Sequence, residues 1–295
     1  MVLSKQAKMD LTGYAFIAPN LVGFFLFTIF PVFFSLVISF TDWDFTQGVT
    51  AIHFNYGHNF LEIWKDKWFL DSLRNTFTYS FTTVPLTIFL AMVLAVVVDQ
   101  TSAGKGPVRL MLLMPYISNI VAVSIVWVMM YAPFGPFTQL VQFLGWKTPP
   151  LWLADYNWAM PALIIMTIWG GLGYAVLIYT AAIQTLSQDL YEAADIDGAG
   201  AVRKFFDITV PLLSPTTFFL LVTYFITSFQ VFAQIQVMTR GGPGTSTNVL
   251  VYYVYTTAFT FYRMGYAAAI SWILFLILFA ITIFQWKGQK KWVNY

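Results

Sequence analysis

A polar stretch rich in alanine and glycine, residues 190–215, separates two long apolar runs and reads LYEAADIDGAGAVRKFFDITVPLLSP. Four carboxylates lie at or just before its N-terminal end: Asp189, Glu192, Asp195 and Asp197. Two cations follow, Arg203 and Lys204. A charged side chain at the centre of a bilayer costs roughly 2.5–3.5 kcal/mol on insertion scales, so this stretch is expected outside any membrane. Its chemistry is electrostatic: Glu192 could pair with an arginine of another protein, or serve only as a solvated capping carboxylate.

Local signals predict two short helices in this stretch. Ser187 can cap the first helix, and Asp189 and Glu192 suit the positive end of its dipole. Gly198 can end that helix in a left-handed turn, and residues 201–208 are typical of a second helix before Pro211. Small side chains leave a low surface that another protein can approach closely; they are Ala193, Ala194, Ala199 and Ala201.

The sequence lacks the residue sets of common catalytic and cofactor sites. It has no cysteine, and its two histidines, His53 and His58, lie in a loop, so neither a metal centre nor a Ser-His-Asp set can be assembled. No Gly-x-x-x-x-Gly-Lys-Ser/Thr sequence is present to hold nucleotide phosphates, and the net charge of +2 gives no indication of nucleic-acid binding. We therefore expect no enzyme activity, and no metal or cofactor in this chain.

The elements that must position these residues are membrane-spanning helices. The 295 residues are 59 % apolar and only 9 % charged, whereas a soluble domain carries about 25 % charged residues. Apolar runs predict six spans, near residues 11–40, 76–98, 110–131, 161–183, 212–237 and 266–286. Prolines are expected to bend the first span, at Pro19 and Pro31, and to interrupt the second, at Pro85. The predicted fold class is all-α, a polytopic membrane protein.

Six spans place both termini on the same side of the membrane. The segments on that side hold nine Lys and Arg residues and those on the other side six, which favours a cytoplasmic location for both termini and for the 184–211 loop. No Asp, Glu, Lys or Arg lies in the middle of a span, whereas ion-coupled carriers usually need such groups. Energy for active transport would therefore have to come from a partner that hydrolyses ATP on the cytoplasmic face.

Neutral polar and aromatic side chains indicate that three spans face something other than lipid. On the fifth span, Tyr224, Thr227, Ser228 and Val231 share one face by their i, i+3, i+4, i+7 spacing. On the fourth span, glycines and aromatic residues are expected to interrupt the helix; these are Trp169, Gly170, Gly171, Gly173 and Tyr174. On the third span, the polar residues Tyr116 and Asn119 follow Pro115. Such groups suit a neutral polyhydroxylated ligand, and plain helix packing is the alternative for each residue.

The loop at residues 187–211 resembles the EAA loop of binding-protein-dependent ABC importer permeases. The pattern of that family is Glu-Ala-Ala, three residues, Gly, nine residues, Ile, one residue, Leu-Pro. The matching positions are Glu192, Ala193, Ala194, Gly198, Ile208 and Pro211, while Val210 stands where Leu is usual. The resemblance implies that Glu192, Ala193, Ala194, Asp197, Gly198 and Ala199 couple this chain to a separate ATPase subunit.

A second segment is similar to carbohydrate-type permeases of the maltose and glycerol-phosphate group. It comprises Thr239-Arg240-Gly241-Gly242-Pro243, then Thr247, Leu250, Tyr252, Tyr253, Tyr255 and Phe259. The resemblance implies the type I importer (MetI-like) fold, with a permease core at residues 72–285. Residues 1–71 would hold the N-terminal tail, the first helix and a long external loop, and residues 286–295 a cytoplasmic tail. The resemblance also implies a location in a prokaryotic cell membrane. The implied partners are a second, homologous permease, two ATP-binding subunits that hold ATP and Mg, an external solute-binding protein and a carbohydrate substrate.

Maltose-type permeases line their sugar path with the third, fourth and fifth of these spans. Motif distances place Tyr116, Gly170, Gly171, Tyr174, Tyr224, Thr227 and Ser228 on that path, and Asn119 and Trp169 lie close by in the sequence. The implied function is sugar import. One alternative is an anionic sugar such as a uronate oligosaccharide or glycerol phosphate, which would need a basic partner permease because Arg240 and Arg263 lie outside the spans. Another is a secondary carrier or a scaffold that transports nothing.

Overall fold

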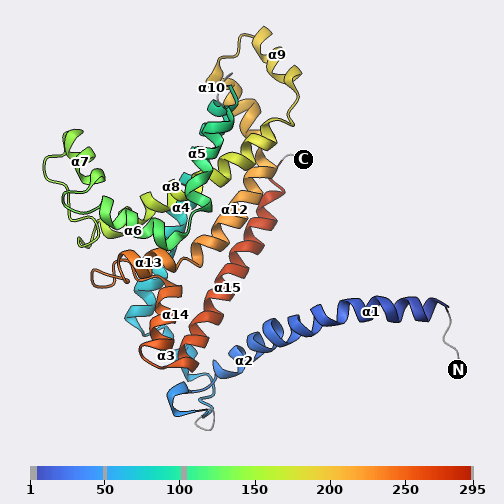
Figure 1. The fold of residues 1–295 in the computed structure, drawn as a ribbon, viewed down its shortest axis with the longest axis vertical. Helices are drawn as coiled ribbons and strands as arrows, with labels where there is room; N and C mark the ends of the chain where they lie inside the picture. Colours follow the sequence, from blue (N-terminus) through green and yellow to red (C-terminus); the bar gives the residue numbers. More distant parts are fainter. Residues whose placement is uncertain (1–4, 49–51, 101–104, 294–295) are drawn as a thin grey trace. The chain divides into compact units, whose positions relative to one another are not determined.

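The computed structural model describes residues 5–48, 52–100 and 105–293 (Figure 1). The predicted tails, and the segment between the second and third predicted spans, lie in part outside these ranges. Within them the chain is helical, apart from one isolated bridge between Thr41 and Phe54, so the predicted all-α class is confirmed. The α-helices are α1 (Lys5–Phe24), α2 (Phe30–Ile38), α3 (His58–Ile63), α4 (Lys67–Gln100), α5 (Lys105–Ile117), α6 (Ile120–Met130), α7 (Pro136–Phe143), α8 (Ala159–Ile183), α9 (Gln188–Ile196), α10 (Ala201–Lys204), α11 (Val210–Leu212), α12 (Ser214–Phe229), α13 (Ala233–Met238), α14 (Leu250–Phe259) and α15 (Met264–Gln289).

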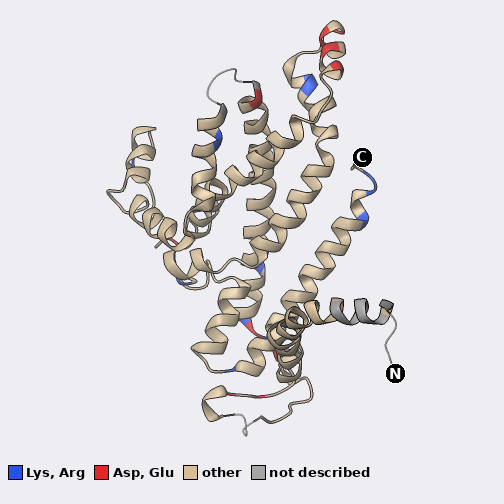
Figure 2. Ribbon diagram, turned by 45° about the vertical axis from the view of Figure 1, so that its right-hand side comes forward, with Lys and Arg blue, Asp and Glu red and all other residues tan. Residues whose placement is uncertain are grey.

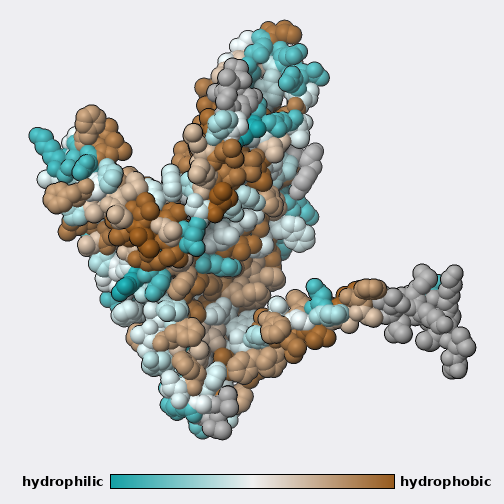
Figure 3. Space-filling view, viewed as in Figure 1, coloured by the Kyte–Doolittle hydropathy of each residue, from teal (hydrophilic) through white to brown (hydrophobic). Residues whose placement is uncertain are grey.

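Four continuous helical stretches of the described chain are long and apolar enough to cross a membrane: Gly13–Ile38, Lys67–Asp99, Ala159–Ile183 and Met264–Gln289. Two further pairs of helices meet the same criteria together but are bent, Gly106–Ile117 with Ile120–Met130 and Ala201–Leu212 with Ser214–Phe229. Counting each bent pair as one span gives the six predicted from the sequence. Charged residues are sparse along these helices (Figure 2), and hydrophobic residues form broad patches on the surface (Figure 3).

The third span differs from its prediction, because it is broken by a bend of 98°. Helix α5 ends two residues after Pro115, whose missing N–H leaves a gap in the helical hydrogen-bond ladder. Asn119 then caps α6: its side-chain oxygen accepts from the backbone N–H of Val121 at 2.9 Å and of Ala122 at 3.3 Å. The run predicted as one straight helix is therefore two helices joined at a capped break.

The fifth span is also bent, by 68°, around Leu213. Pro215 has no N–H to give to the carbonyl of Pro211, and the Ser214 hydroxyl donates to that carbonyl instead, at 2.6 Å. The span ends at Phe229 rather than near residue 237 as predicted, since Gln230 to Phe232 leave helical geometry before α13 begins. Val231 is therefore not on the same helix as Tyr224, and the predicted four-residue face is wrong at that residue.

The fourth and second spans are continuous helices, which corrects two further predictions. Gly170, Gly171 and Gly173 lie inside α8 without interrupting it. Gly173 serves close packing, because a Cβ at this position would overlap the carbonyl of Leu112 on α5. Pro85 lies inside α4, which runs unbroken for 34 residues. Packing against neighbouring helices outweighs both of these helix-breaking signals.

Two π-helical turns stand just before prolines, at Phe25–Ile29 and at Phe205–Thr209. In each case the proline is the second residue after the turn, Pro31 or Pro211. The ring of a proline clashes with the carbonyl four residues earlier in an α-helix, and a wider turn accommodates it. The expected disturbance of the first span near Pro31 thus takes the form of one widened turn.

The chain divides into two compact units. The first unit comprises the described part of Met1–Lys65 together with Val254–Ile273. Inside it, the Asn59 side chain donates to the carbonyls of Ser39 and Thr41, each at 2.9 Å, and Arg263 pairs with Glu62 at 2.8 Å. These contacts fix the loop that follows the first span.

The second unit comprises Asp66–Tyr253 and Leu274–Tyr295. Helix α4 packs against α8 and α12, and α8 also packs against α5. The loop of residues 239–249 is anchored on α4, because the Asn75 side chain donates to the carbonyls of Thr245 and Asn248 at 2.6 and 3.0 Å. Both cavities described next lie inside this unit.

Candidate functional site

The loop at residues 187–211 has the local structure that the sequence predicts. Helix α9 begins after Ser187, whose hydroxyl accepts from the Asp189 N–H at 3.3 Å. It ends before Gly198, which has a φ of +73°, a left-handed conformation that favours glycine. The second helical limb begins at Ala201 and continues through the π-turn to Leu212, four residues beyond the predicted end.

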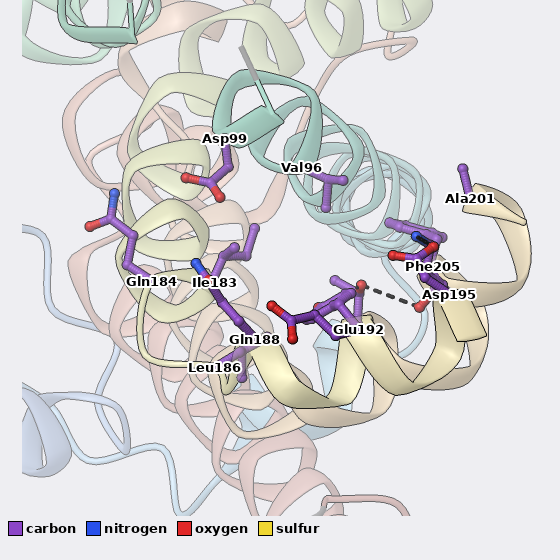
Figure 4. A pocket seen from close by; sticks show the side chains of 13 residues that line it. Val96, Asp99, Ile183, Gln184, Leu186, Gln188, Glu192, Asp195, Ala201 and Phe205 are labelled. Atoms are coloured by element: carbon purple, nitrogen blue, oxygen red, sulfur yellow. Dashed lines mark hydrogen bonds and ion pairs between the residues drawn. The ribbon is translucent and has the colours of Figure 1, made fainter. Parts of the chain in front are cut away.

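A cavity of about 650 Å³ lies between this loop and the adjoining ends of α4 and α8 (Figure 4). Three carboxylates and one cation line it, so we refer to it as the acidic cavity. Its residues are Val96, Asp99, Ile183, Gln184, Leu186, Gln188, Tyr191, Glu192, Asp195, Ala201, Lys204, Phe205 and Thr209. An excess of negative charge in a recess that opens to solvent favours a basic side chain from another molecule.

Among the predicted coupling residues, only Glu192 lines the acidic cavity. Ala193, Asp197 and Gly198 are exposed, and Ala194 and Ala199 are half-buried. All of them lie on α9 or in the turn after it, on the outer part of the loop, where Figure 2 shows acidic residues. The structure leaves this set accessible to a partner.

Sequence reasoning did not identify the other walls of the acidic cavity. Asp99, from the end of α4, forms an ion pair with Arg109 of α5 at 3.7 Å. It is about 90 residues from Glu192 in the sequence, so no spacing signal joins the two. Large apolar side chains on the loop were also missed: Ile196 is 88 % exposed and Val202 72 % exposed. Exposed apolar side chains beside acidic ones are typical of a docking surface.

A second cavity, of about 490 Å³, lies among α4, α8, α12 and the break between α5 and α6. None of its described lining residues is charged, so we refer to it as the neutral cavity. Six of the predicted substrate residues line it: Tyr116, Gly170, Gly171, Tyr224, Thr227 and Ser228. Residues from three separate spans thus meet at one place, as the prediction requires.

Aromatic stacking and one hydrogen bond shape the wall of the neutral cavity. The rings of Tyr116 and Tyr174 stack with centroids 4.8 Å apart, and the rings of Tyr174 and Tyr224 are 6.4 Å apart. The Tyr224 hydroxyl donates to the Gly171 carbonyl at 2.6 Å. Tyr174 therefore supports two lining residues without lining the cavity itself.

The other two predicted substrate residues are engaged elsewhere. The side-chain oxygen of Asn119 is used in the cap of α6. Trp169 packs edge-on against Trp127, with ring centroids 5.5 Å apart. Val231, which lies past the end of α12, is buried and lines the neutral cavity.

Helix α4 supplies a wall of the neutral cavity that the prediction missed. Tyr79, Thr83 and Thr87 line it at i, i+4, i+8 spacing, which a search for polar faces on the second span could have found. The Tyr79 hydroxyl is 2.8 Å from that of Thr167 on α8. The Thr83 hydroxyl is buried and has no hydrogen-bond partner among the described residues.

The side chains that line the two cavities differ in the ligands they suit. Across the described ranges, no three His, Cys, Asp or Glu side chains form a cluster that could hold a metal ion. The neutral cavity offers hydroxyls, amides and ring faces, which bind uncharged polar molecules. The acidic cavity offers carboxylates to a cation.

Comparison with known proteins extends this description. The family model of the binding-protein-dependent transport system inner membrane component matches residues 14–287. The probable ABC transporter permease protein YesP of Bacillus subtilis (strain 168) is 34 % identical over 292 residues, covering 98 % of this chain and 93 % of the relative. The lactose transport system permease protein LacF of Rhizobium radiobacter is 31 % identical over 293 residues, covering 98 % and 97 %.

Among solved structures, a chain of a bacterial ABC transporter involved in the import of the acidic polysaccharide alginate superposes with a TM-score of 0.83. The sequences are 23 % identical, and the match covers 98 % of this chain and 99 % of that one. A chain from the structure of a bacterial alginate ABC transporter in complex with an alginate pentasaccharide-bound periplasmic protein superposes with a TM-score of 0.82. Fold and family model agree over nearly the whole length. The chain therefore belongs to the family of binding-protein-dependent transport system inner membrane components, the membrane-embedded parts of transporters rather than enzymes.

Proposed function

We propose that this chain is the permease subunit of an ABC importer of neutral sugars or oligosaccharides, and that the sugar passes through the neutral cavity. The observation that carries the proposal is the lining of that cavity, in which hydroxyl, amide and aromatic side chains from several spans meet without a charged one. Rings can stack on the apolar faces of a sugar, while hydroxyls and amides bond to its OH groups. The lactose transport relative fits this substrate class, whereas the alginate transporter imports an acidic polysaccharide, so the choice of a neutral sugar rests on the cavity lining.

Transport is powered by a separate ATPase that docks at the acidic cavity. Glu192 and Asp99 receive a basic side chain of that subunit, and the exposed Ile196 and Val202 supply apolar contact. ATP and Mg are held by the ATPase subunits. Both termini and the 187–211 loop face the cytoplasm, as the distribution of Lys and Arg supports. A second permease, two ATPase subunits and an external solute-binding protein complete the transporter.

Docking is tested by co-purification of the ATPase subunits with tagged permease. Glu192→Arg places a cation in the acidic cavity, and Gly198→Pro alters the left-handed turn after α9, so both variants should recover at least about tenfold less ATPase than wild type. Asp207→Asn is the matched control, since Asp207 is 63 % exposed and does not line the cavity. Full recovery of ATPase with both variants would refute docking at this loop.

The substrate class is tested by uptake into proteoliposomes that contain the complete transporter. Radiolabelled lactose and maltose are compared with glycerol 3-phosphate and a uronate oligosaccharide. Preferential uptake of the neutral sugars supports the proposal. Preferential uptake of the anionic compounds would reassign the substrate and place a basic residue on the second permease. ATP-independent uptake would instead indicate a secondary carrier.

A further inference from the structure

Two side-chain contacts join α9 to the helical limb that leads into the fifth span. Lys204 Nζ is 2.6 Å from Asp195 Oδ1, and the hydroxyls of Tyr191 and Thr209 are 3.0 Å apart. The Lys204 side chain is only 23 % exposed and Thr209 is almost fully buried. Tyr191 and Asp195 are four residues apart on α9, so they share one face of that helix.

The π-turn Phe205–Thr209 lets Lys204 and Thr209 point from the same side of their helical limb toward α9. Lys204 and Thr209 are five residues apart, and in an α-helix their side chains would point about 140° away from each other, at 100° per residue. In the π-turn the backbone bonds run i→i+5, as the bond from the Val210 N–H to the Phe205 carbonyl shows. The Thr209 hydroxyl donates to the Lys204 carbonyl at 3.3 Å, so Thr209 lies one turn after Lys204 on the same side of the limb.

A neighbouring ion pair does not connect α9 to the next limb. Arg203 and Asp207 pair at 3.3 Å within the same limb, with side chains 74 % and 63 % exposed. An exposed pair within one helix contributes little to stability and joins no two elements. The Asp195–Lys204 and Tyr191–Thr209 contacts, together called the clamp, connect α9 to the next limb across the turn at Gly198.

We infer that the clamp makes α9 and the start of the fifth span one rigid lever, so that a movement of α9 is transmitted into α12. The inference rests on the proposed docking of an ATPase on this loop. Gly198 and its neighbours would otherwise be a flexible joint, in which α9 could follow the ATPase without moving the spans. The clamp residues are positioning residues: they act through the direction of α9 and not by touching the sugar.

The test compares transport with ATP hydrolysis in the assembled transporter in proteoliposomes, with radiolabelled lactose and maltose as probes. The variants are Tyr191→Phe, Thr209→Val, Lys204→Met and the pair Tyr191→Phe/Lys204→Met, with Arg203→Met as the matched control. The pair should take up at least about tenfold less sugar per ATP hydrolysed, equivalent to roughly 1.4 kcal/mol of lost coupling. Arg203→Met should stay within about twofold of wild type.

Three further measurements separate the clamp from a docking contact and from misfolding. Tyr191, Lys204 and Thr209 also line the acidic cavity, but their variants leave its carboxylates in place, so ATPase recovery on tagged permease should not fall, whereas Glu192→Arg loses it. Thr209→Val should add little to the uncoupling by Tyr191→Phe, because both remove the Tyr191–Thr209 bond, and the Thr209 bond to the Lys204 carbonyl joins no two elements. The double variant Asp195→Lys/Lys204→Asp swaps the two charges of the ion pair. It should retain a large part of the coupling that Lys204→Met loses.

Coupling that stays at the wild-type ratio in the pair, with ATPase bound, would overturn the clamp and leave the proposed docking intact. Loss of ATPase from the clamp variants would also overturn it, since the residues would then be docking contacts. Failure of Glu192→Arg to reduce ATPase recovery would refute the docking proposal itself.

Discussion

The two cavities of the second unit use their polar groups in different ways. In the acidic cavity, Asp195 and Asp99 are paired with Lys204 and Arg109, while Glu192 is exposed, and the lining carries net negative charge. In the neutral cavity most hydroxyls are bonded within the protein, such as Tyr224 to the Gly171 carbonyl and Thr87 to the Thr83 carbonyl. The first arrangement leaves charge available to a partner, and the second fixes the shape of a container.

This difference follows from the surroundings of each cavity. Outside the membrane, water solvates a carboxylate until a partner arrives, so exposed charge costs little. Among spans, an unpaired polar group costs roughly 1–3 kcal/mol, so hydroxyls bond to helix carbonyls wherever they can. A docking site can therefore be assembled from exposed groups on one loop, whereas a path through the membrane requires several helices packed together.

The largest expected effect is on the packing behind the neutral cavity. Gly173→Ala would place a Cβ against the Leu112 carbonyl and 2.8 Å from the Leu113 Cα, forcing α5 away from α8. We expect a loss of about 1–3 kcal/mol of stability, seen as a lower unfolding temperature of the purified transporter in detergent. Gly170→Ala is the control, since nothing lies within 4 Å of its added Cβ. Equal unfolding temperatures for the two variants would contradict the close approach of α5 and α8.

Removal of the hydrogen bond across the neutral cavity wall should have a smaller effect. Tyr224→Phe frees the ring from the Gly171 carbonyl and loosens its packing with Tyr174. We expect the sugar concentration for half-maximal uptake to rise about fivefold, from a lost contribution of about 1 kcal/mol. Tyr14→Phe, at a tyrosine that is 69 % exposed on α1, should change nothing. An unchanged uptake curve for Tyr224→Phe would remove this residue from the path.

Removal of one charge from the acidic cavity should have a still smaller effect. Asp99→Asn leaves the shape of the cavity and lowers its negative charge. We expect the affinity for the ATPase to fall about threefold at low salt, with a smaller difference at high salt, since such charges are screened. Titration of purified ATPase onto permease in detergent, at two salt concentrations, measures the effect. An affinity that rises would indicate an acidic partner surface.

The smallest effect is expected at Thr83. Thr83→Val removes a buried hydroxyl that has no hydrogen-bond partner among the described residues, so stability should be unchanged or slightly higher. Thr87→Val removes a hydroxyl that donates to the Thr83 carbonyl at 2.8 Å, so stability should fall by about 0.5–1 kcal/mol. Thermal unfolding compares the two. A clear loss of stability in Thr83→Val would mean that its hydroxyl has a partner after all.

The local structure of the loop at residues 187–211 could be predicted because its signals are local. Ser187, Glu192 and Gly198 lie within twelve residues, and capping, dipole and left-handed turn preferences act over such distances. The span positions were also predictable, because an apolar run of sufficient length has few alternatives to a membrane helix. The predicted domain boundaries and the roles of the predicted site residues stay predictions.

The sequence by itself determined that this chain is a helical membrane protein and predicted a charged loop outside the bilayer, because composition and local turn chemistry act without reference to distant residues. Only the tertiary structure decided that Asp99 stands beside that loop, that α4 lines the neutral cavity, and that the third and fifth spans bend. Each of these depends on which helices pack together and on how freed carbonyls find new donors, as the Pro211 carbonyl finds the Ser214 hydroxyl. Such long-range choices leave no periodic signal in the chain.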